Sequence, residues 1–411
     1  MTTGERARTS NAPRELNEET LDLVRRRIGI PVRFSPREHN EVASTDSFRH
    51  FARGYGDDNP LYGDPEYAAS SSWSGPIAPP VYLFSAGISR PVEWSDAEKE
   101  AMSGGDPLAG IGQYMCGERW LFASPVRPGD VMYRSQSLYG AELKSSRLGD
   151  GVGALVTHRV RWEAGDGRLL GFRYLDYMHV DRDKSKKAGE KRVVERATYT
   201  DDDVERLDAL YAAESVRGAE HLSIDEVEVG ARLGPIAKGP LSVTDILSWH
   251  TGTGWGMFGG GPSKIAYQNR QRIPKFYTRN EQGFWDTVQR CHWDDEWAQR
   301  MGHPAAYDYG VMRTAWMAQL VGNWMGDGAW IWKITATARK FDYLGDAHVV
   351  SGVVSEVDRD RGTVTVDAEG VNQRGETTCT ARIVVILAGS DGGPAVIPEY
   401  DPEDDPEAAA P

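Results

Sequence analysis

The chain has 411 residues, of which 40% are hydrophobic and 26% charged, and this length and balance suit two globular domains rather than one domain or a disordered chain. Its net charge of -14 argues against nucleic acid as a partner. Three distant cysteines without a CxxC spacing fit a reducing cytosol better than a disulfide framework or a zinc site. No apolar run reaches the roughly 18 residues of a membrane span. We therefore expect a cytoplasmic protein that does not enter a membrane.

The first half begins with a polar segment, residues 1–14, that is expected to be disordered. Apolar spacing predicts a helix over 46–56, and the turn-rich stretch "GDDNPLYGDPEYA" follows at 56–68. The apolar run 74–87 predicts a further helix. After a Gly-Asp turn at 124–130, alternating apolar and polar residues with turns such as "GDG" predict an antiparallel meander.

A charged stretch at 181–203 interrupts the strand-like runs and leads into a helical pattern over 203–214. This stretch is the natural boundary between two units. The predicted division is a first unit over 15–182, a charged linker with a helix over 183–219, a second unit over 220–390 and an acidic disordered tail over 391–411.

The second half repeats the plan of the first. A helix is predicted over 242–254, with Thr244 or Asp245 as its N-terminal cap. The stretch "HWDDEWA" at 292–298 takes the place of "YGDPEYA" at 62–68, an apolar helix is predicted within 302–324, and strands with turns such as "QRGE" follow. The chain therefore reads as a duplicated α+β unit.

The stretch at 56–68 resembles the signature of the MaoC-like hydratases and dehydratases, approximately Gly-Asp-x-Asn-Pro-x-His-x-Asp-Pro-x-Tyr-Ala. The matching residues are Gly56, Asp57, Asn59, Pro60, Asp64, Pro65, Tyr67 and Ala68. Tyr62 departs from the signature by standing where the family has histidine. The resemblance implies a tandem hot-dog fold, each unit a long helix wrapped by an antiparallel sheet, with a first unit of the FAS1-like dehydratase type and a second, divergent MaoC unit.

The resemblance also implies an activity. Such proteins hydrate the α,β double bond of an acyl thioester, usually of coenzyme A, or remove water to form it, and they need neither a metal nor a redox cofactor. An aspartate and a histidine handle the water and the proton, and a backbone N–H at the start of the central helix stabilises the negative charge on the thioester oxygen. A homodimer, or a hetero-oligomer with another hot-dog protein, is the expected assembly.

The first unit looks non-catalytic on these criteria. Tyr62 has an ordinary pKa of about 10 and is a poor base near neutrality. Pro79 and Pro80 stand at the expected helix start, where N–H donors are needed and proline has none. We expect this unit to hold a bulky acyl group, and we assign Asp57, Asn59 and Tyr62 to substrate binding.

The second unit carries the complementary groups. His292 falls in the slot that Tyr62 occupies, and Gly310 keeps its N–H at the start of the helix. The family's aspartate position corresponds to Trp255, and Asp286 is the nearest carboxylate upstream of His292. The predicted catalytic residues are therefore His292, Asp286 and Gly310, with Trp255 and Tyr309 added to the substrate-binding residues.

Three alternatives stay open at this point. The protein could be a non-catalytic acyl-binding subunit of a MaoC-type hetero-complex, or a hot-dog thioesterase, which also uses a carboxylate and the helix-start N–H. His292, Asp294 and His348 also imitate the two-histidine, one-carboxylate set of Fe(II)/2-oxoglutarate oxygenases. Against the iron site, Asp294 aligns with Asp64, and helix capping explains an aspartate at both positions.

Overall fold

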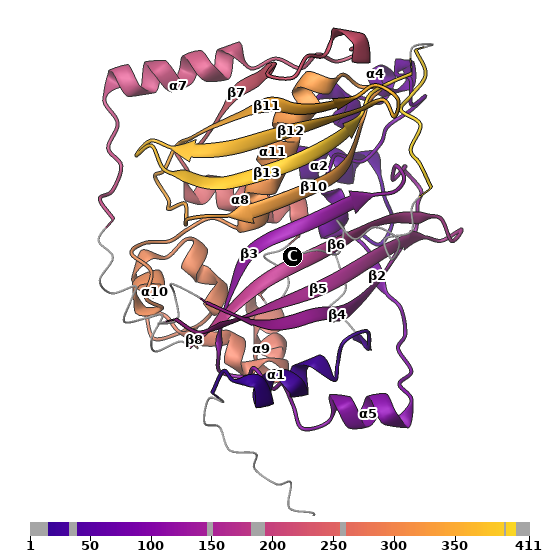
Figure 1. The fold of residues 1–411 in the computed structure, drawn as a ribbon. Helices are drawn as coiled ribbons and strands as arrows, with labels where there is room; N and C mark the ends of the chain where they lie inside the picture. Colours follow the sequence, from indigo (N-terminus) through magenta and orange to yellow (C-terminus); the bar gives the residue numbers. More distant parts are fainter. Residues whose placement is uncertain are drawn as a thin grey trace, which may run out of the picture.

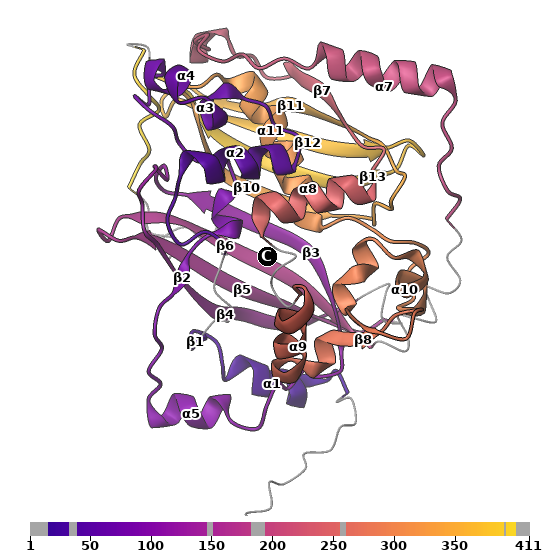
Figure 2. The same ribbon diagram turned by 180° about the vertical axis from the view of Figure 1, so that it is seen from behind.

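The computed structural model describes residues 15–32, 39–145, 151–181, 194–254, 260–389 and 392–399. Within them, eleven strands form a single sheet in the order β1-β4-β5-β6-β3-β10-β13-β12-β11-β7, with β2 beside β4 (Figure 1). Helices α2, α8 and α11 lie together on one face of this sheet (Figure 2). Of the described helices, none is both long and apolar enough to cross a membrane. The expected disordered segments, 1–14 and most of 391–411, lie outside the described residues.

The first unit supplies six strands and a set of short helices. Its elements are α1 (Glu18–Arg25), β1 (Pro31–Val32), α2 (Thr45–Gly54), α3 (Pro60–Gly63), α4 (Pro65–Ser70), the 3-10 helix η1 (Tyr82–Ser85), β2 (Ile88–Ser89), α5 (Asp96–Met102), β3 (Gly112–Phe122), β4 (Met132–Lys144), β5 (Gly153–Ala164) and β6 (Leu169–Val180). Strands β4, β5 and β6 form the expected antiparallel meander. The helix α7 (Asp201–Ala213) follows in the linker, as the apolar spacing predicted.

The second unit supplies the other five strands of the sheet and the long central helix. Its elements are η2 (Ile224–Glu226), β7 (Arg232–Lys238), α8 (Val243–Thr253), α9 (Ser263–Arg272), η4 (Pro274–Phe276), β8 (Tyr277–Arg279), β9 (Trp285–Thr287), η5 (Val288–His292), α10 (Asp295–Arg300), α11 (Gly310–Met325), β10 (Trp330–Ala338), β11 (His348–Asp358), β12 (Thr363–Asn372) and β13 (Thr377–Ile386). Strands β8 and β9 form a separate hairpin.

The helices predicted over 46–56 and 242–254 are confirmed as α2 and α8. The predicted cap of α8 is wrong by a few residues. Ser242 is the N-cap, and its hydroxyl accepts a hydrogen bond from the N–H of Asp245, whose carboxylate accepts from the N–H of Ser242 in return. This reciprocal capping box satisfies two of the amides that a helix start leaves without partners.

The helix predicted over 74–87 is wrong, because only the single 3-10 turn η1 forms there. Pro79 and Pro80 cannot donate to a helical hydrogen-bond ladder, and Val81 has a left-handed backbone with φ of 59° that no α-helix contains. The equivalent position in the second unit holds α11, a helix of 16 residues that is buried along nearly its whole length. The two units therefore differ most in their central helix.

Strands β3 and β10 join the two units into one body. They pair antiparallel, with Trp120 opposite Ile334. At this junction Arg173 of β6 donates from Nε to a carboxylate oxygen of Glu118 on β3, 2.6 Å away, and Thr314 of α11 donates its hydroxyl to the other oxygen. Glu118 and Arg173 are both buried. One cluster of buried apolar residues runs through both units. The two units therefore share a single hydrophobic core.

Candidate active site

The start of α11 has no side-chain cap. Tyr309 is the N-cap residue, with an extended backbone (φ -91°, ψ 128°), and its side chain makes no capping hydrogen bond. The first N–H groups of a helix have no partner within the helix, and they lie at the positive end of its dipole. The amide of Gly310, the first residue of α11, is therefore placed to stabilise negative charge.

His292 lies beside this helix start, at the end of η5. Its Nδ1 is 2.8 Å from the carbonyl oxygen of Tyr307. A carbonyl oxygen can only accept, so Nδ1 carries the proton and the lone pair of the neutral ring is on Nε2. The ring stacks on Tyr309 with 3.7 Å between ring centroids and 30° between planes. Burial lowers the pKa of His292 to about 3, so the imidazole is neutral at physiological pH and its Nε2 lone pair is free of a proton.

A second histidine completes this group from α8. Nε2 of His250 and the hydroxyl of Tyr309 are 2.8 Å apart and share a hydrogen bond. Burial lowers the pKa of His250 to about 4, so this ring is neutral as well. His250, Tyr309 and His292 thus form a continuous row of polar aromatic groups at the N-cap of α11. Sequence reasoning missed His250, because a lone histidine near the end of an amphipathic helix carries no signal of its partner 59 residues away.

Asp286, the residue proposed to replace the missing aspartate, is not among the described neighbours of His292. Asp286 lies on β9, and its carboxylate accepts from the N–H of Thr287 at 2.7 Å. The described interactions of His292 involve its neighbours Tyr307, Tyr309, His250 and His303 rather than Asp286. Trp255 lies outside the described residues.

The family-like motif of the first unit uses its polar groups for local structure. Asp57 is buried, accepts from the hydroxyl of Tyr55 and from the N–H of Asn59, each at 3.0 Å, and has its pKa raised by burial to about 6. The side chain of Asn59 in turn accepts from the N–H of Leu61 at the start of α3. Both polar groups are therefore occupied in shaping the turn before α3.

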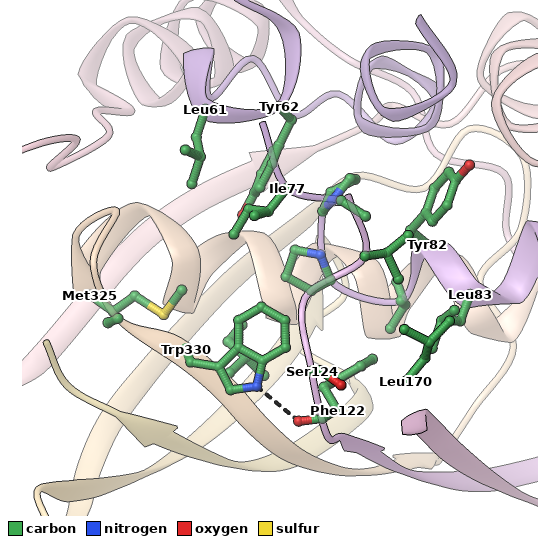
Figure 3. Close-up of a pocket in the computed structure, with 17 residues that line it drawn as sticks. Leu61, Tyr62, Ile77, Tyr82, Leu83, Phe122, Ser124, Leu170, Met325 and Trp330 are labelled. Atoms are coloured by element: carbon green, nitrogen blue, oxygen red, sulfur yellow. Dashed lines mark hydrogen bonds between the residues drawn. The ribbon is translucent and has the colours of Figure 1, made fainter. Parts of the chain in front are cut away.

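Tyr62 is buried to 3% exposure and lines a small apolar cavity of about 30 Å³. Figure 3 shows it with Met325 from the end of α11 and Trp330 from β10. Pro79 and Pro80 form part of the same wall. The hydroxyl of Tyr62 lies close to Gly322 of α11, only 3.9 Å from the position that a Cβ would occupy there. Gly322 is twelve residues after Gly310, which is about 18 Å along the helix axis. Tyr62 and His292 therefore occupy two separate places near opposite ends of one helix.

The residues of the iron-oxygenase alternative have other partners. His348 is buried with Nε2 2.6 Å from a carboxylate oxygen of Asp342. Asp294 caps α10 by accepting from the N–H of Trp297, and Asp64 caps α4 in the same way, as predicted. In the described part of the chain, no group of three or more His, Cys, Asp or Glu side chains is arranged to hold a metal ion. The structure thus gives this alternative no support.

Comparison with known proteins agrees with this architecture. Residues 30–170 match a protein-family model described as the FAS1-like dehydratase domain region. A solved structure described as a MaoC-like dehydratase is similar over 88% of this chain and 99% of its own, with a TM-score of 0.58 and 14% identity. The chain has the MaoC-like double hot-dog fold. The predicted fold class and the resemblance to this family are therefore confirmed.

Two further solved structures are similar to this chain. A putative MaoC domain protein dehydratase from Chloroflexus aurantiacus has a TM-score of 0.51 and 12% identity, covering 89% of this chain and 96% of its own. The other is a conserved hypothetical protein from Mycobacterium tuberculosis that is described as having a double hot-dog fold. Its TM-score is 0.49 and its identity 13%, and the match covers 87% of this chain and 95% of that protein. No curated protein matches the sequence. Identities this low show the fold, so the roles of residues rest on this chain's own geometry.

Proposed function

We propose that this MaoC-like protein is a hydratase or dehydratase that acts on the α,β double bond of an acyl-CoA thioester. The observation that carries the proposal is that the neutral ring of His292 stacks on Tyr309, the N-cap residue of α11 that directly precedes Gly310. The match of the first unit to a dehydratase region supports the same reaction class.

The proposed reaction needs one base and one oxyanion donor. Nε2 of His292 removes a proton from water as the water oxygen bonds to the β-carbon of the enoyl thioester. Negative charge moves to the thioester oxygen, where the N–H of Gly310 and the positive end of α11 stabilise it. The proton then returns from His292 to the α-carbon, so one water has been added. The Tyr309 hydroxyl, held by His250, is the polar group best placed to orient the water.

Several finer features belong to the same proposal. Adding water changes no oxidation state, so the reaction uses no redox cofactor, and coenzyme A enters only as part of the substrate. We propose a bulky acyl group, because the first unit has only the short η1 where the second has the long α11. We also propose a cytoplasmic location and assembly as a homodimer or with another hot-dog protein.

The test is a panel of enoyl-CoA substrates, followed by the absorbance of the conjugated thioester. His292→Ala should lower kcat by roughly 10²- to 10⁴-fold, the usual contribution of a general base. The exposed His221 offers a matched control, and His221→Ala should leave kcat unchanged. Full activity in His292→Ala would refute the proposed role, and release of free coenzyme A, detected with a thiol reagent, would indicate a thioesterase instead.

A second candidate function is that of a non-catalytic acyl-binding subunit. It is favoured by one observation: among the described residues, the groups that interact with His292 include no carboxylate side chain. A subunit of this kind would bind acyl-CoA in a calorimetric titration while every substrate in the panel remained unchanged. Turnover by the isolated chain would exclude it.

A further inference from the structure

A strongly basic segment directly precedes the segment that carries His292, in a protein whose net charge is -14. We call residues 263–287, which span α9, η4 and the β8–β9 hairpin, the basic arm. Residues 261–280 contain five cations and no acid, and the cations are Lys264, Arg270, Arg272, Lys275 and Arg279. Within the described part of the chain, none of the five forms an ion pair. The whole arm also contains Glu281 and Asp286, so its five cations leave it with a net charge of +3.

Exposed aromatic rings lie among these cations. The guanidinium groups of Arg270 and Arg279 lie 5.1 and 4.9 Å from the ring centroid of Trp285. Arg270 also lies 5.6 Å from the ring of Tyr267. Trp285 is 36% exposed and Tyr267 is 56% exposed, so both side chains reach the surface beside these guanidinium groups. Flat aromatic rings stack on nucleotide bases, and guanidinium groups bind phosphate through paired hydrogen bonds.

The arm is fixed to the segment that carries His292. Arg290 of η5 is 1% exposed in its side chain and donates to the carbonyl oxygens of Thr287 at 2.9 Å and Arg279 at 3.2 Å. Trp285 precedes His292 by seven residues, so their Cα atoms are at most about 25 Å apart. Figure 2 shows α9 and β8 side by side below α8 and α10. A ligand that reaches from His292 to the arm would therefore stay within one side of the molecule.

We propose that the basic arm binds the nucleotide end of the coenzyme A thioester, an adenine nucleotide with several phosphates. The base stacks on Trp285 or Tyr267, and Arg270 and Arg279 bind the phosphates. This inference rests on the proposed function, because it assigns the second end of the same substrate. A longer nucleic acid does not fit, since the rest of the chain is acidic and would repel an extended polyanion.

Binding is tested first without catalysis. Adenosine 3′,5′-bisphosphate is titrated calorimetrically into the full chain, into the double variant Arg270→Ala/Arg279→Ala and into Trp285→Ala. Each variant should bind about tenfold or more weakly, because a charge-assisted phosphate contact or a stacked base is lost. Arg300→Ala is the matched control, since this exposed arginine lies 5.4 Å from the Trp297 ring but outside the arm, and it should bind as the unaltered chain does.

Kinetics then separate the two ends of the substrate. With an enoyl-CoA, the double variant should raise KM about tenfold or more at constant kcat. With the same acyl group on N-acetylcysteamine, which has no nucleotide, KM should not change. Added adenosine 3′,5′-bisphosphate should compete with the enoyl-CoA.

The outcomes are distinguishable from failure of the proposed function. If no thioester is turned over, the function fails, while nucleotide binding that depends on Arg270 and Arg279 still supports the arm. Absence of nucleotide binding by the unaltered chain, or equal binding by the arm variants, overturns the inference. Nucleotide binding that leaves enoyl-CoA turnover unaffected would identify a site for a free nucleotide and overturn the assignment to coenzyme A.

Discussion

The amide of Gly310 can be removed without disturbing the helix that carries it. Proline is well tolerated at the first position of a helix, because the N–H lost there has no partner within the helix. The residue before a proline must be extended, and Tyr309 already is, at φ -91° and ψ 128°. Gly310→Pro therefore deletes the proposed oxyanion donor while α11 keeps its hydrogen bonds.

A matched variant isolates the lost N–H from the added bulk. A Cβ at Gly310 would lie 3.0 Å from Sδ of Met115, the movable end of a flexible side chain. Gly310→Ala introduces this contact and keeps the N–H, so the difference between alanine and proline reports the donor. Removing one oxyanion-hole donor costs roughly 10²- to 10³-fold in kcat. We expect this ratio between the two variants, with thermal midpoints close to each other.

The assay is the loss of the conjugated thioester absorbance at saturating enoyl-CoA, with thermal unfolding measured on the same samples. Equal kcat in the alanine and proline variants would refute the role of the Gly310 amide. A thermal midpoint much lower in the proline variant than in the alanine variant would instead show that the N–H of Gly310 has a hydrogen-bond partner in the folded protein.

The remaining predictions concern pH and the buried ion pair. Because burial lowers the pKa of His292 to about 3, kcat/KM should stay flat as pH falls to about 5, whereas a fall with a midpoint near the ordinary histidine pKa of about 6.5 would contradict the assignment. His179 is 6% exposed with neither ring nitrogen partnered, and burial lowers its pKa to about 4. As pH falls through about 6.5, the His179 side chain is protonated in the unfolded chain but not yet in the folded protein, so the unfolding free energy decreases. His179→Leu removes this effect. Measured in urea titrations, the drop in unfolding free energy between pH 7.5 and 5 should be about 2 kcal/mol smaller in this variant than in the unaltered chain. Glu118→Gln should lower the unfolding free energy by about 3 to 5 kcal/mol, because it leaves Arg173 buried without a charged partner. Thr314→Val removes only the neutral hydrogen bond to Glu118 and should lower it by about 1 kcal/mol. Equal losses in the two variants would show that the charge of Glu118 is unimportant for stability.

Local patterns in the sequence predicted the elements that local forces determine. The helices α2, α7 and α8 follow from apolar spacing, and the capping roles of Asp64 and Asp294 follow from aspartate before a helical turn. The prediction of a helix over 74–87 was wrong for an equally local reason. An apolar run suggested it, yet two consecutive prolines and a left-handed residue allow only the turn η1.

Long-range contacts were beyond the reach of these patterns. Nothing near His250 indicates that its partner is Tyr309, and nothing in β3 indicates that its neighbour is β10, more than 200 residues later. The role of the segment before His292 was also hidden. Its glycines and aromatic residues marked an insertion, and its cations are visible in the sequence, but the packing of Arg270 and Arg279 around Trp285 follows only from the structure.

The pairing of β3 with β10 within one chain has a consequence for how the two units can change. In a symmetric homodimer every substitution occurs twice, so a site cannot be altered in one copy and kept in the other. Here the second unit is a different stretch of the same chain, so its sequence can differ from that of the first unit and it is always present. The two units can therefore differ, and the first has Tyr62 and the short η1 where the second has His292 and the long α11.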